Sequence, residues 1–306
     1  MCLLNYSVNE EFTKWDSAIL AEWFAIIGLG NYSEAVLCSG LTGQQLLVEL
    51  SYAGDVLLEK LLQMKNHFHR KKLRLAVSIA NHTTDELTTS AAKMDYLCVA
   101  KWLDDIGLPQ YKELFLENRI DGPVLHRLTV QDLNRLKINT QLHHASIKTG
   151  IRILRLNAFN SNCLIRRASS PAATIGPKHG DEPPESGASH DPAEVALWSS
   201  FRVMEWLKSI DLAEYMTNLR ASGVHGGLIV HEDSFNSNVL ATLLSIPTNK
   251  SLLRRHLATY FLQLVGYEIG QRKRSYQDRT GGAPIPFSKV KVSDLSIFFD
   301  FFEMRL

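Results

Sequence analysis

The feature that most constrains the fold is a spaced set of apolar and aromatic residues that occurs three times. In each copy a tryptophan is followed by Ile four residues on, Leu six residues on and Tyr nine residues on. The copies begin at Trp23, Trp102 and Trp206. Residues four apart lie on one face of a helix, and the Gly or Asp that follows suits a left-handed helix end. Three copies in register indicate a repeated domain.

The remainder of each unit repeats as well. About 40 to 46 residues past each Trp lies a basic and then apolar stretch that is typical of a helix. These stretches are residues 67–77, 142–151 and 252–262. A glycine-bearing turn stands between, and we align Ser39-Gly40, Asp121-Gly122 and Ser222-Gly223. Each unit therefore spans about 65–70 residues, the size of a small self-contained helical domain.

The middle unit has the clearest helical pattern. We expect helices at 97–106 and 109–117, followed by one that Thr129 and Asp132 open as a capping box. A last helix at 142–157 presents Leu142, Ile147, Ile151 and Leu154 to the core. No β-hairpin signal occurs in this unit. Five helices in each unit predict an all-α fold of three tandem five-helix bundles.

Composition changes set the domain boundaries. Trp15, Met94 and Trp198 each stand eight residues before a repeat Trp and are expected to fold back onto its core. Pro, Gly, Ser and acidic residues dominate from 168 to 194, which predicts disorder before the third bundle, and the C-terminal tail is expected to be poorly ordered. The predicted segments are a lead-in at 1–14, bundles at 15–82, 94–159 and 197–267, a linker at 160–196 and a tail at 268–306.

Charge and cysteine usage narrow the class of protein. A net charge of +1 argues against a chain that coats nucleic acid or an anionic membrane. The four cysteines form no C-x-x-C pair, which fits reduced thiols. The chain has no run of about 18 apolar residues and no signal-peptide pattern at its start. We therefore expect a cytoplasmic protein without membrane insertion.

One cluster of basic residues lies at a helix N-terminus, where the helix dipole disfavours positive charge. Residues 65–84 hold five Lys or Arg and no acid, at the N-terminus of the first unit's last helix. The helix dipole disfavours cations there by about 0.3–1 kcal/mol each. The cluster therefore needs an acidic neighbour, in this chain or another, or exposure to water.

No residue pattern indicates catalysis or cofactor binding. His67 and His69, and the pair His143-His144, have no Cys or acid at ligand spacing, so we expect no metal site. No phosphate-loop or nucleophile motif occurs, and small bundles offer no deep cleft. Arg166-Arg167-Ala168-Ser169 has the spacing that basophilic kinases favour, which makes Ser169 a candidate phosphorylation site. The sequence predicts a non-enzyme without cofactors.

The repeated motifs resemble sterile alpha motif (SAM) domains, which are five-helix interaction modules. The carrying residues are 29–32 and 69–73 in the first unit; 102–112, 121–122 and 142–148 in the second; and 202–207, 211–215, 222–228 and 252–259 in the third. Three in tandem resemble the C-terminal region of the liprin family, and its beta branch most. Liprin-beta proteins carry coiled coils that are missing here, so a short product or fragment is expected.

The resemblance implies a scaffold that binds the SAM region of a liprin-alpha at synaptic and cell-adhesion sites, linked indirectly to LAR-type receptor phosphatases. SAM domains pair by setting the start of the last helix against an acidic middle surface of a partner, and some of these surfaces are used within a tandem. Carried over, the first surface is Arg70, Lys71, Arg254 and Arg255, and the second is Glu117 and Asp121. Two alternatives stay open: RNA-hairpin binding through residues 67–74, and weak self-association into homo-oligomers.

Overall fold

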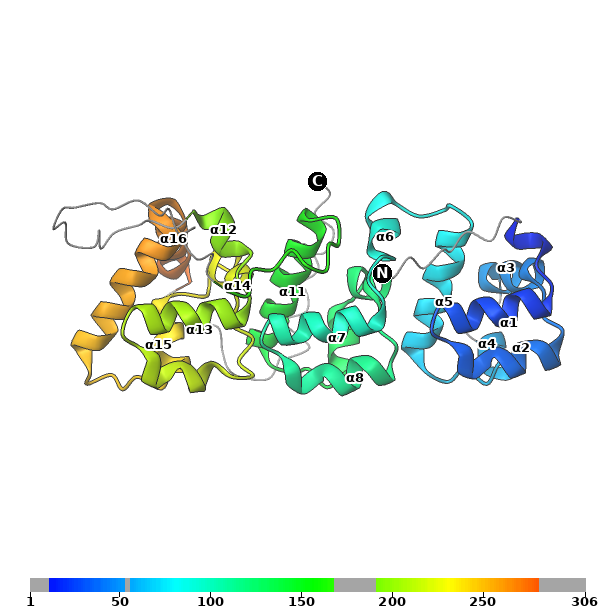
Figure 1. Ribbon diagram of the computed structural model, residues 1–306, viewed down its shortest axis with the longest axis horizontal. Helices are drawn as coiled ribbons and strands as arrows, with labels where there is room; N and C mark the ends of the chain where they lie inside the picture. Colours follow the sequence, from blue (N-terminus) through cyan, green and yellow to red (C-terminus); the bar gives the residue numbers. More distant parts are fainter. Residues whose placement is uncertain (1–10, 53–55, 168–190, 281–306) are drawn as a thin grey trace, which may run out of the picture. The chain divides into compact units, whose positions relative to one another are not determined.

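The computed structural model describes residues 11–52, 56–167 and 191–280, and throughout these ranges the chain is helical, without a strand (Figure 1). Ile165 and Trp198 form a single isolated β-bridge. The all-α prediction is confirmed. In chain order the elements are η1 Phe12–Lys14, α1 Ser17–Ile26, η2 Gly30–Tyr32, α2 Ser33–Ser39, α3 Gly43–Tyr52, α4 Val56–Leu61, α5 His67–Ala80, α6 Glu86–Ala91, α7 Tyr96–Asp105, η3 Pro109–Tyr111, α8 Lys112–Glu117, α9 Gly122–His126, α10 Val130–Arg135, α11 Gln141–Leu156, α12 Pro192–Ala196, α13 Ser200–Ser209, η4 Ala213–Leu219, α14 Gly226–His231, α15 Ser237–Leu243 and α16 Ser251–Arg279.

These elements belong to two compact units. The first comprises residues up to 101 together with 111–128 and 155–161, and the second comprises 102–110, 129–154 and the chain from 162 onward. A core of the first unit gathers Trp15, Trp23 and Phe24 from the first repeat, and the Trp15 and Trp23 rings lie 5.5 Å apart. The apolar core of the second unit combines residues of α11 with residues of α12 to α16.

The backbone torsions repeat three times along the chain. The helices α1, α7 and α13 are each followed by a residue with positive φ, as the sequence predicts for the Gly or Asp at that position. A second such residue lies twelve positions later, and a third lies just before the last helix. The three sets are Gly28, Gly40 and Gln63; Gly107, Arg119 and Lys137; and Asp211, Gly223 and Ser245.

The alignment of the glycine-bearing turns is wrong for the middle repeat. The residue with positive φ that corresponds to Gly40 and Gly223 is Arg119, which has φ of 50°. Aligning Gly122 with these glycines shifted the register by three residues. The shift arose because a non-glycine residue takes the left-handed conformation here, and composition alone does not reveal it.

Gly122 occupies a different repeated position, where two backbone segments approach closely. Its amide N–H donates to the carbonyl of Met94 at 2.8 Å, and a Cβ at Gly122 would overlap the carbonyl oxygen of Ala91. The same arrangement joins Gly43 to Trp15 at 2.9 Å and Gly226 to Trp198 at 2.8 Å. The residues predicted to fold back onto each core, Trp15, Met94 and Trp198, are all buried.

The helices of the middle repeat follow the prediction closely. Thr129 caps α10 in a capping box, with both the Thr129 and the Asp132 side chains bonded to backbone N–H groups. The last helix, α11, runs from Gln141 to Leu156, one residue earlier at each end than expected. All four residues assigned to its core face are buried: Leu142, Ile147, Ile151 and Leu154.

The linker and the tail are shorter than predicted. Residues 192–196 form α12, whose Val195 is fully buried, and Cys163, Leu164 and Ile165 pack against the second unit's core. At the other end α16 changes direction at Gly266 (φ 77°) and continues to Arg279. The buried Lys273 there donates to the carbonyl of Glu232 at 2.6 Å. The disorder expected at 168–190 and after 280 lies outside the described residues.

Candidate protein-interaction surfaces

The basic start of α5 meets the acid that its position requires. Lys72 Nζ lies 2.9 Å from Asp121 Oδ2, and both side chains are buried. Lys72 also donates to the carbonyl of Arg119 at 3.2 Å. Asp121 in turn caps α9 by accepting the N–H of Val124 at 3.1 Å. The first repeat's last helix therefore packs against the segment Lys112–His126 of the second repeat, within the first unit.

His69 extends this contact as a neutral imidazole. Its Nε2 lies 3.2 Å from the carbonyl of Glu117, which only accepts, so Nε2 carries the proton. Its Nδ1 then accepts the hydroxyl proton of Tyr32, at 2.8 Å. Burial lowers the pKa of His69, which favours the neutral ring. The motif residue Tyr32 thus orients the side chain that reaches the next repeat.

Lys71 and Arg70, both predicted to contact a partner, take different positions in the structure. Lys71 donates to the carbonyl of Arg127 at 2.6 Å and so belongs to the contact. Arg70 is buried and turns inward: it donates to the carbonyls of Met64 and Lys65 and pairs with Glu59 at 2.9 Å. We therefore revise its expected role, because a guanidinium bonded to its own repeat is not available to a partner.

The acidic candidates are likewise engaged within the chain. Asp121 is buried in the ion pair with Lys72, and Glu117 contributes its backbone carbonyl to His69. The basic stretch proposed for RNA is also occupied, since Lys72 is buried and His69 bonds to Glu117. The prediction that Glu117 and Asp121 contact another protein stays a prediction, and Asp121 has little surface left for it.

The second unit contains an analogous contact between α11 and the third repeat. His225 Nε2 donates to the carbonyl of Ser146 at 3.0 Å, and Gly223 N–H donates to the carbonyl of Gly107 at 3.0 Å. Lys148 pairs with Glu232 at 2.8 Å. Leu142 and Ala145, near the start of α11, share one apolar cluster with Val224 and Leu228 of the third repeat.

One hydrogen bond aligns the starts of the three last helices. Arg70, His144 and Arg254 each bond to the carbonyl of the apolar residue that follows the left-handed position, namely Met64, Ile138 and Ile246. Two residues before Arg70, His144 and Arg254 lie the apolar residues Phe68, Leu142 and Leu252, respectively. Phe68 is 4% exposed and Leu142 is 2% exposed, whereas Leu252 is 77% exposed. The start of α16 is thus the open member of the set.

Arg255 follows on the same open helix start and is exposed, and its role as a contact residue stays a prediction. Arg254 resembles Arg70 instead, since its guanidinium donates twice to the carbonyl of Ile246, at 3.2 and 3.0 Å. Leu252 is not among the surface residues predicted from the sequence. The sequence marks Leu252 only by its apolar side chain, and because Leu253 is also apolar, the sequence does not show which of the two lies at the open surface.

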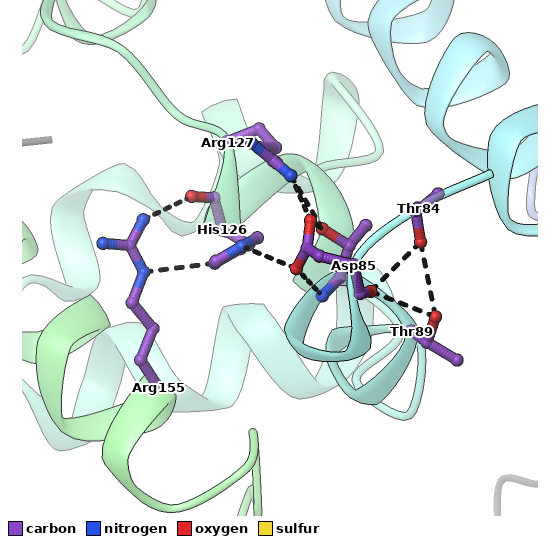
Figure 2. A network of polar contacts seen from close by, with 7 residues as sticks. Thr84, Asp85, Thr89, His126, Arg127 and Arg155 are labelled. Carbon is purple, nitrogen blue, oxygen red and sulfur yellow. Dashed lines mark hydrogen bonds and ion pairs between the residues drawn. The ribbon is translucent and has the colours of Figure 1, made fainter. Parts of the chain in front are cut away.

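A third polar network holds the short helix α6 between the first two repeats (Figure 2). Asp85 caps α6 through the N–H of Thr88 at 2.9 Å and pairs with Arg127. Burial opposes ionisation of Asp85, but the bonds from Thr88 and the charges of Arg127 and His126 lower its pKa to about 2. Arg155 donates to His126 Nδ1 at 3.1 Å, and burial lowers the pKa of His126 to about 4.

The predicted phosphorylation site is not described, because Ser169 lies outside the described residues. Arg166, part of the motif, forms a bidentate pair with Asp105 at 2.7 and 2.8 Å. Among the described residues no group of three or more His, Cys, Asp or Glu is placed to hold a metal ion. In the same ranges none of the helices is long and apolar enough to cross a membrane.

Comparison with known proteins agrees with this geometry. The sterile alpha motif (SAM) domain family matches residues 95–155 and again residues 195–265. The chain is 46% identical over 270 residues to liprin-beta-1 of Mus musculus, which covers 88% of the chain and 26% of that protein. It is 34% identical over 251 residues to kazrin of Homo sapiens, with 80% and 30% covered. It is 30% identical over 264 residues to liprin-alpha-1 of Homo sapiens, with 83% and 20% covered.

Fold, junctions and family matches together define a SAM-domain protein. The chain spans about a quarter of the length of the liprin-beta-1 that it matches. It belongs to the liprin family, and corresponds to a SAM region of the liprin-beta type.

Proposed function

We propose that this chain is a non-enzymatic scaffold that binds other proteins through SAM–SAM contacts, and that the SAM region of a liprin-alpha is its partner. The observation that carries the proposal is the use of one contact twice within the chain. In both junctions the start of a last helix lies against the middle of the next repeat. A surface that binds a SAM domain in two places is suited to bind one in another protein.

We further propose that the chain has three SAM domains. The SAM family matches two segments, and residues 15–82 carry the third copy. The left-handed residues Gly28, Gly40 and Gln63 support this, together with the close approach of Gly43 to Trp15. In a chain of three SAM domains, the middle surface of the first repeat and the last-helix start of the third remain to contact another SAM domain.

The proposed setting is the cytoplasmic side of cell-contact sites or of the presynaptic active zone. There the chain would connect liprin-alpha, and through it LAR-type receptor phosphatases, to other proteins. The similarity to both liprin-beta-1 and liprin-alpha-1 supports a scaffold of this kind.

Light scattering on a sizing column tests the partner, with the chain run alone and mixed with the three-SAM fragment of a liprin-alpha. We expect a complex in the mixture. Arg255→Glu should weaken it about tenfold, because the charge at the start of α16 steers association and selects the partner. Arg274→Glu is the matched control, an exposed cation on the same helix far from its start.

Two results would contradict the proposal at different points. A mixture that elutes as separate components removes liprin-alpha as the partner. A complex that Arg255→Glu and Arg274→Glu weaken equally removes the start of α16 from the interface.

A further inference from the structure

A basic motif lies near the C-terminal end of α16. The segment Arg272-Lys273-Arg274-Ser275 places an arginine three residues before a serine. Basophilic serine/threonine kinases favour this spacing, because acidic side chains of the kinase pair with the guanidinium. Among residues 11–52, 56–167 and 191–280, Ser275 is the sole serine or threonine with an arginine at that distance before it. Its side chain is exposed on the helix surface.

The arginine of this motif is bound to another part of the third repeat. Arg272 Nε donates to Asp233 Oδ1 at 2.5 Å, and a second guanidinium nitrogen donates to the carbonyl of Val230 at 2.7 Å. The adjacent Lys273 is buried and donates to the carbonyl of Glu232 at 2.6 Å. These acceptors lie at the C-terminal end of α14, where basic side chains commonly bond the last carbonyls of a helix. The motif is therefore docked on α14.

A kinase cannot bind this motif while it is helical and docked. Kinases bind the residues around the acceptor serine as an extended segment, in which residues three apart are separated by about 10 Å. In a helix the rise between Arg272 and Ser275 is roughly 4.5 Å. The end of α16 must therefore leave α14 and unwind before the reaction. Helix ends open at a lower free energy than a whole domain, so this step leaves the rest of the third repeat folded.

We propose that Ser275 is a phosphorylation site for a basophilic serine/threonine kinase, and that the contact between α16 and α14 limits the rate of the reaction. The co-substrate is ATP. A bond forms between the γ-phosphorus and Ser275 Oγ, the bond from that phosphorus to the oxygen of the β-phosphate breaks, ADP leaves and the hydroxyl proton is released. This chain supplies only the acceptor and the motif, so the proposal does not depend on which protein the chain binds.

The phosphate would change the charge of an exposed surface. It adds close to two negative charges to Ser275. Arg272 lies three residues before Ser275 and Arg279 four residues after it, so both are neighbours of the phosphate on the helix surface. Arg279 already donates to the carbonyl of Ser275 at 3.3 Å. The phosphate therefore competes with Asp233 for Arg272 and reduces the positive charge at the end of α16.

Treatment of the full chain with ATP and the catalytic subunit of cyclic-AMP-dependent protein kinase tests the site. Ser169 and Ser170 also have an arginine three residues before them, so both are replaced with Ala in every chain compared. Mass spectrometry of the peptide that contains Ser275 measures the rate of phosphorylation. We expect phosphate at this residue, and Ser275→Ala should abolish the signal.

Asp233→Asn tests the control by docking, because it releases Arg272 without altering the motif that the kinase binds. The rate at Ser275 should rise roughly one-and-a-half- to fivefold, since loss of a partly exposed ion pair shifts the local opening equilibrium by that factor. Asp233→Glu keeps the charge and should leave the rate closer to that of the parent chain. Asp211→Asn is the matched control, at an exposed aspartate elsewhere in the same repeat, and should leave the rate unchanged.

The two parts of the proposal can fail separately. Chains that take up no phosphate at Ser275, with or without Asp233→Asn, overturn the assignment of the site. Equal rates in the Asp233→Asn and Asp211→Asn chains overturn the control by docking. Neither result bears on whether the chain binds a liprin-alpha, which the sizing experiment decides.

Discussion

The buried ion pair between Lys72 and Asp121 makes a quantitative prediction for the first junction. Replacing Lys72 with Met keeps a side chain of similar length and removes its charge. The Asp121 carboxylate then remains buried with the N–H of Val124 as its bond on α9, while its cation at 2.9 Å is lost. Leaving one member of a buried pair uncompensated costs about 3–5 kcal/mol.

Calorimetry of the full chain measures this cost. For a cooperative unit of this size 1 kcal/mol corresponds to about 2–4 °C, so Lys72→Met should lower the melting temperature of the first unit by roughly 6–20 °C. Lys71→Met is the matched control, with the same chemical change next door. Lys71 makes a solvent-exposed bond to the carbonyl of Arg127, and its loss should cost about 1 kcal/mol or less.

A second change separates charge from packing. Asp121→Asn keeps an N-cap for α9 and removes the buried negative charge. Combined with Lys72→Met it should recover part of the lost stability, because neither partner is then a buried unpaired ion. If Lys72→Met costs no more than Lys71→Met, the ion pair does not hold this junction and the reasoning is refuted.

Three further perturbations test other contacts. Truncation after Gly266 should destabilise the third repeat by about 2 kcal/mol or more, seen as a lower melting temperature, because Lys273 and its helix pack on the core. Gly122→Ala should cost more than about 3 kcal/mol in urea unfolding, since its Cβ meets a carbonyl, whereas Gly40→Ala, at φ of 62° in open space, should cost about 1 kcal/mol. Burial lowers the pKa of His225 to about 4, below the unfolded value of 6.5, so stability present above pH 6.5 is lost towards pH 4. From pH 7 to pH 5 this loss is about 2 kcal/mol, and His225→Gln should flatten it.

Much of the fold is predictable from sequence because the repeat is specified by short-range sequence features. The spacing from Trp102 to Tyr111, the helix end at Gly107 and the capping box at Thr129 all depend on neighbouring residues. The errors occur where tertiary contacts decide. Arg119 adopts a left-handed conformation that its residue type does not predict. The helix α16 continues beyond Gly266, and there Lys273 donates to the carbonyl of Glu232 in another part of the repeat.

The interaction surface is less predictable than the fold, because a basic residue's position in sequence does not tell which way its side chain turns. Arg70 and Lys71 are adjacent, yet Arg70 bonds inward to Met64 and Lys71 reaches the next repeat. Arg254 and Arg255 differ in the same way, because Arg254 bonds to its own repeat whereas Arg255 is exposed. The folded helix starts show this difference, which the residue types alone do not.

The two junctions also explain how repeats of different sequence use one mode of contact. At the first junction the acceptors include backbone carbonyls, which every sequence supplies, and Lys72 also meets a carboxylate. At the second junction the direction is partly reversed, since His225 of the third repeat donates to the carbonyl of Ser146. Both junctions contain an ion pair from a lysine of the last helix to an acid of the next repeat, Lys72 with Asp121 and Lys148 with Glu232. They share a buried apolar side chain at the start of the last helix, and selectivity between partners then depends on which apolar surface and which flanking charges surround it.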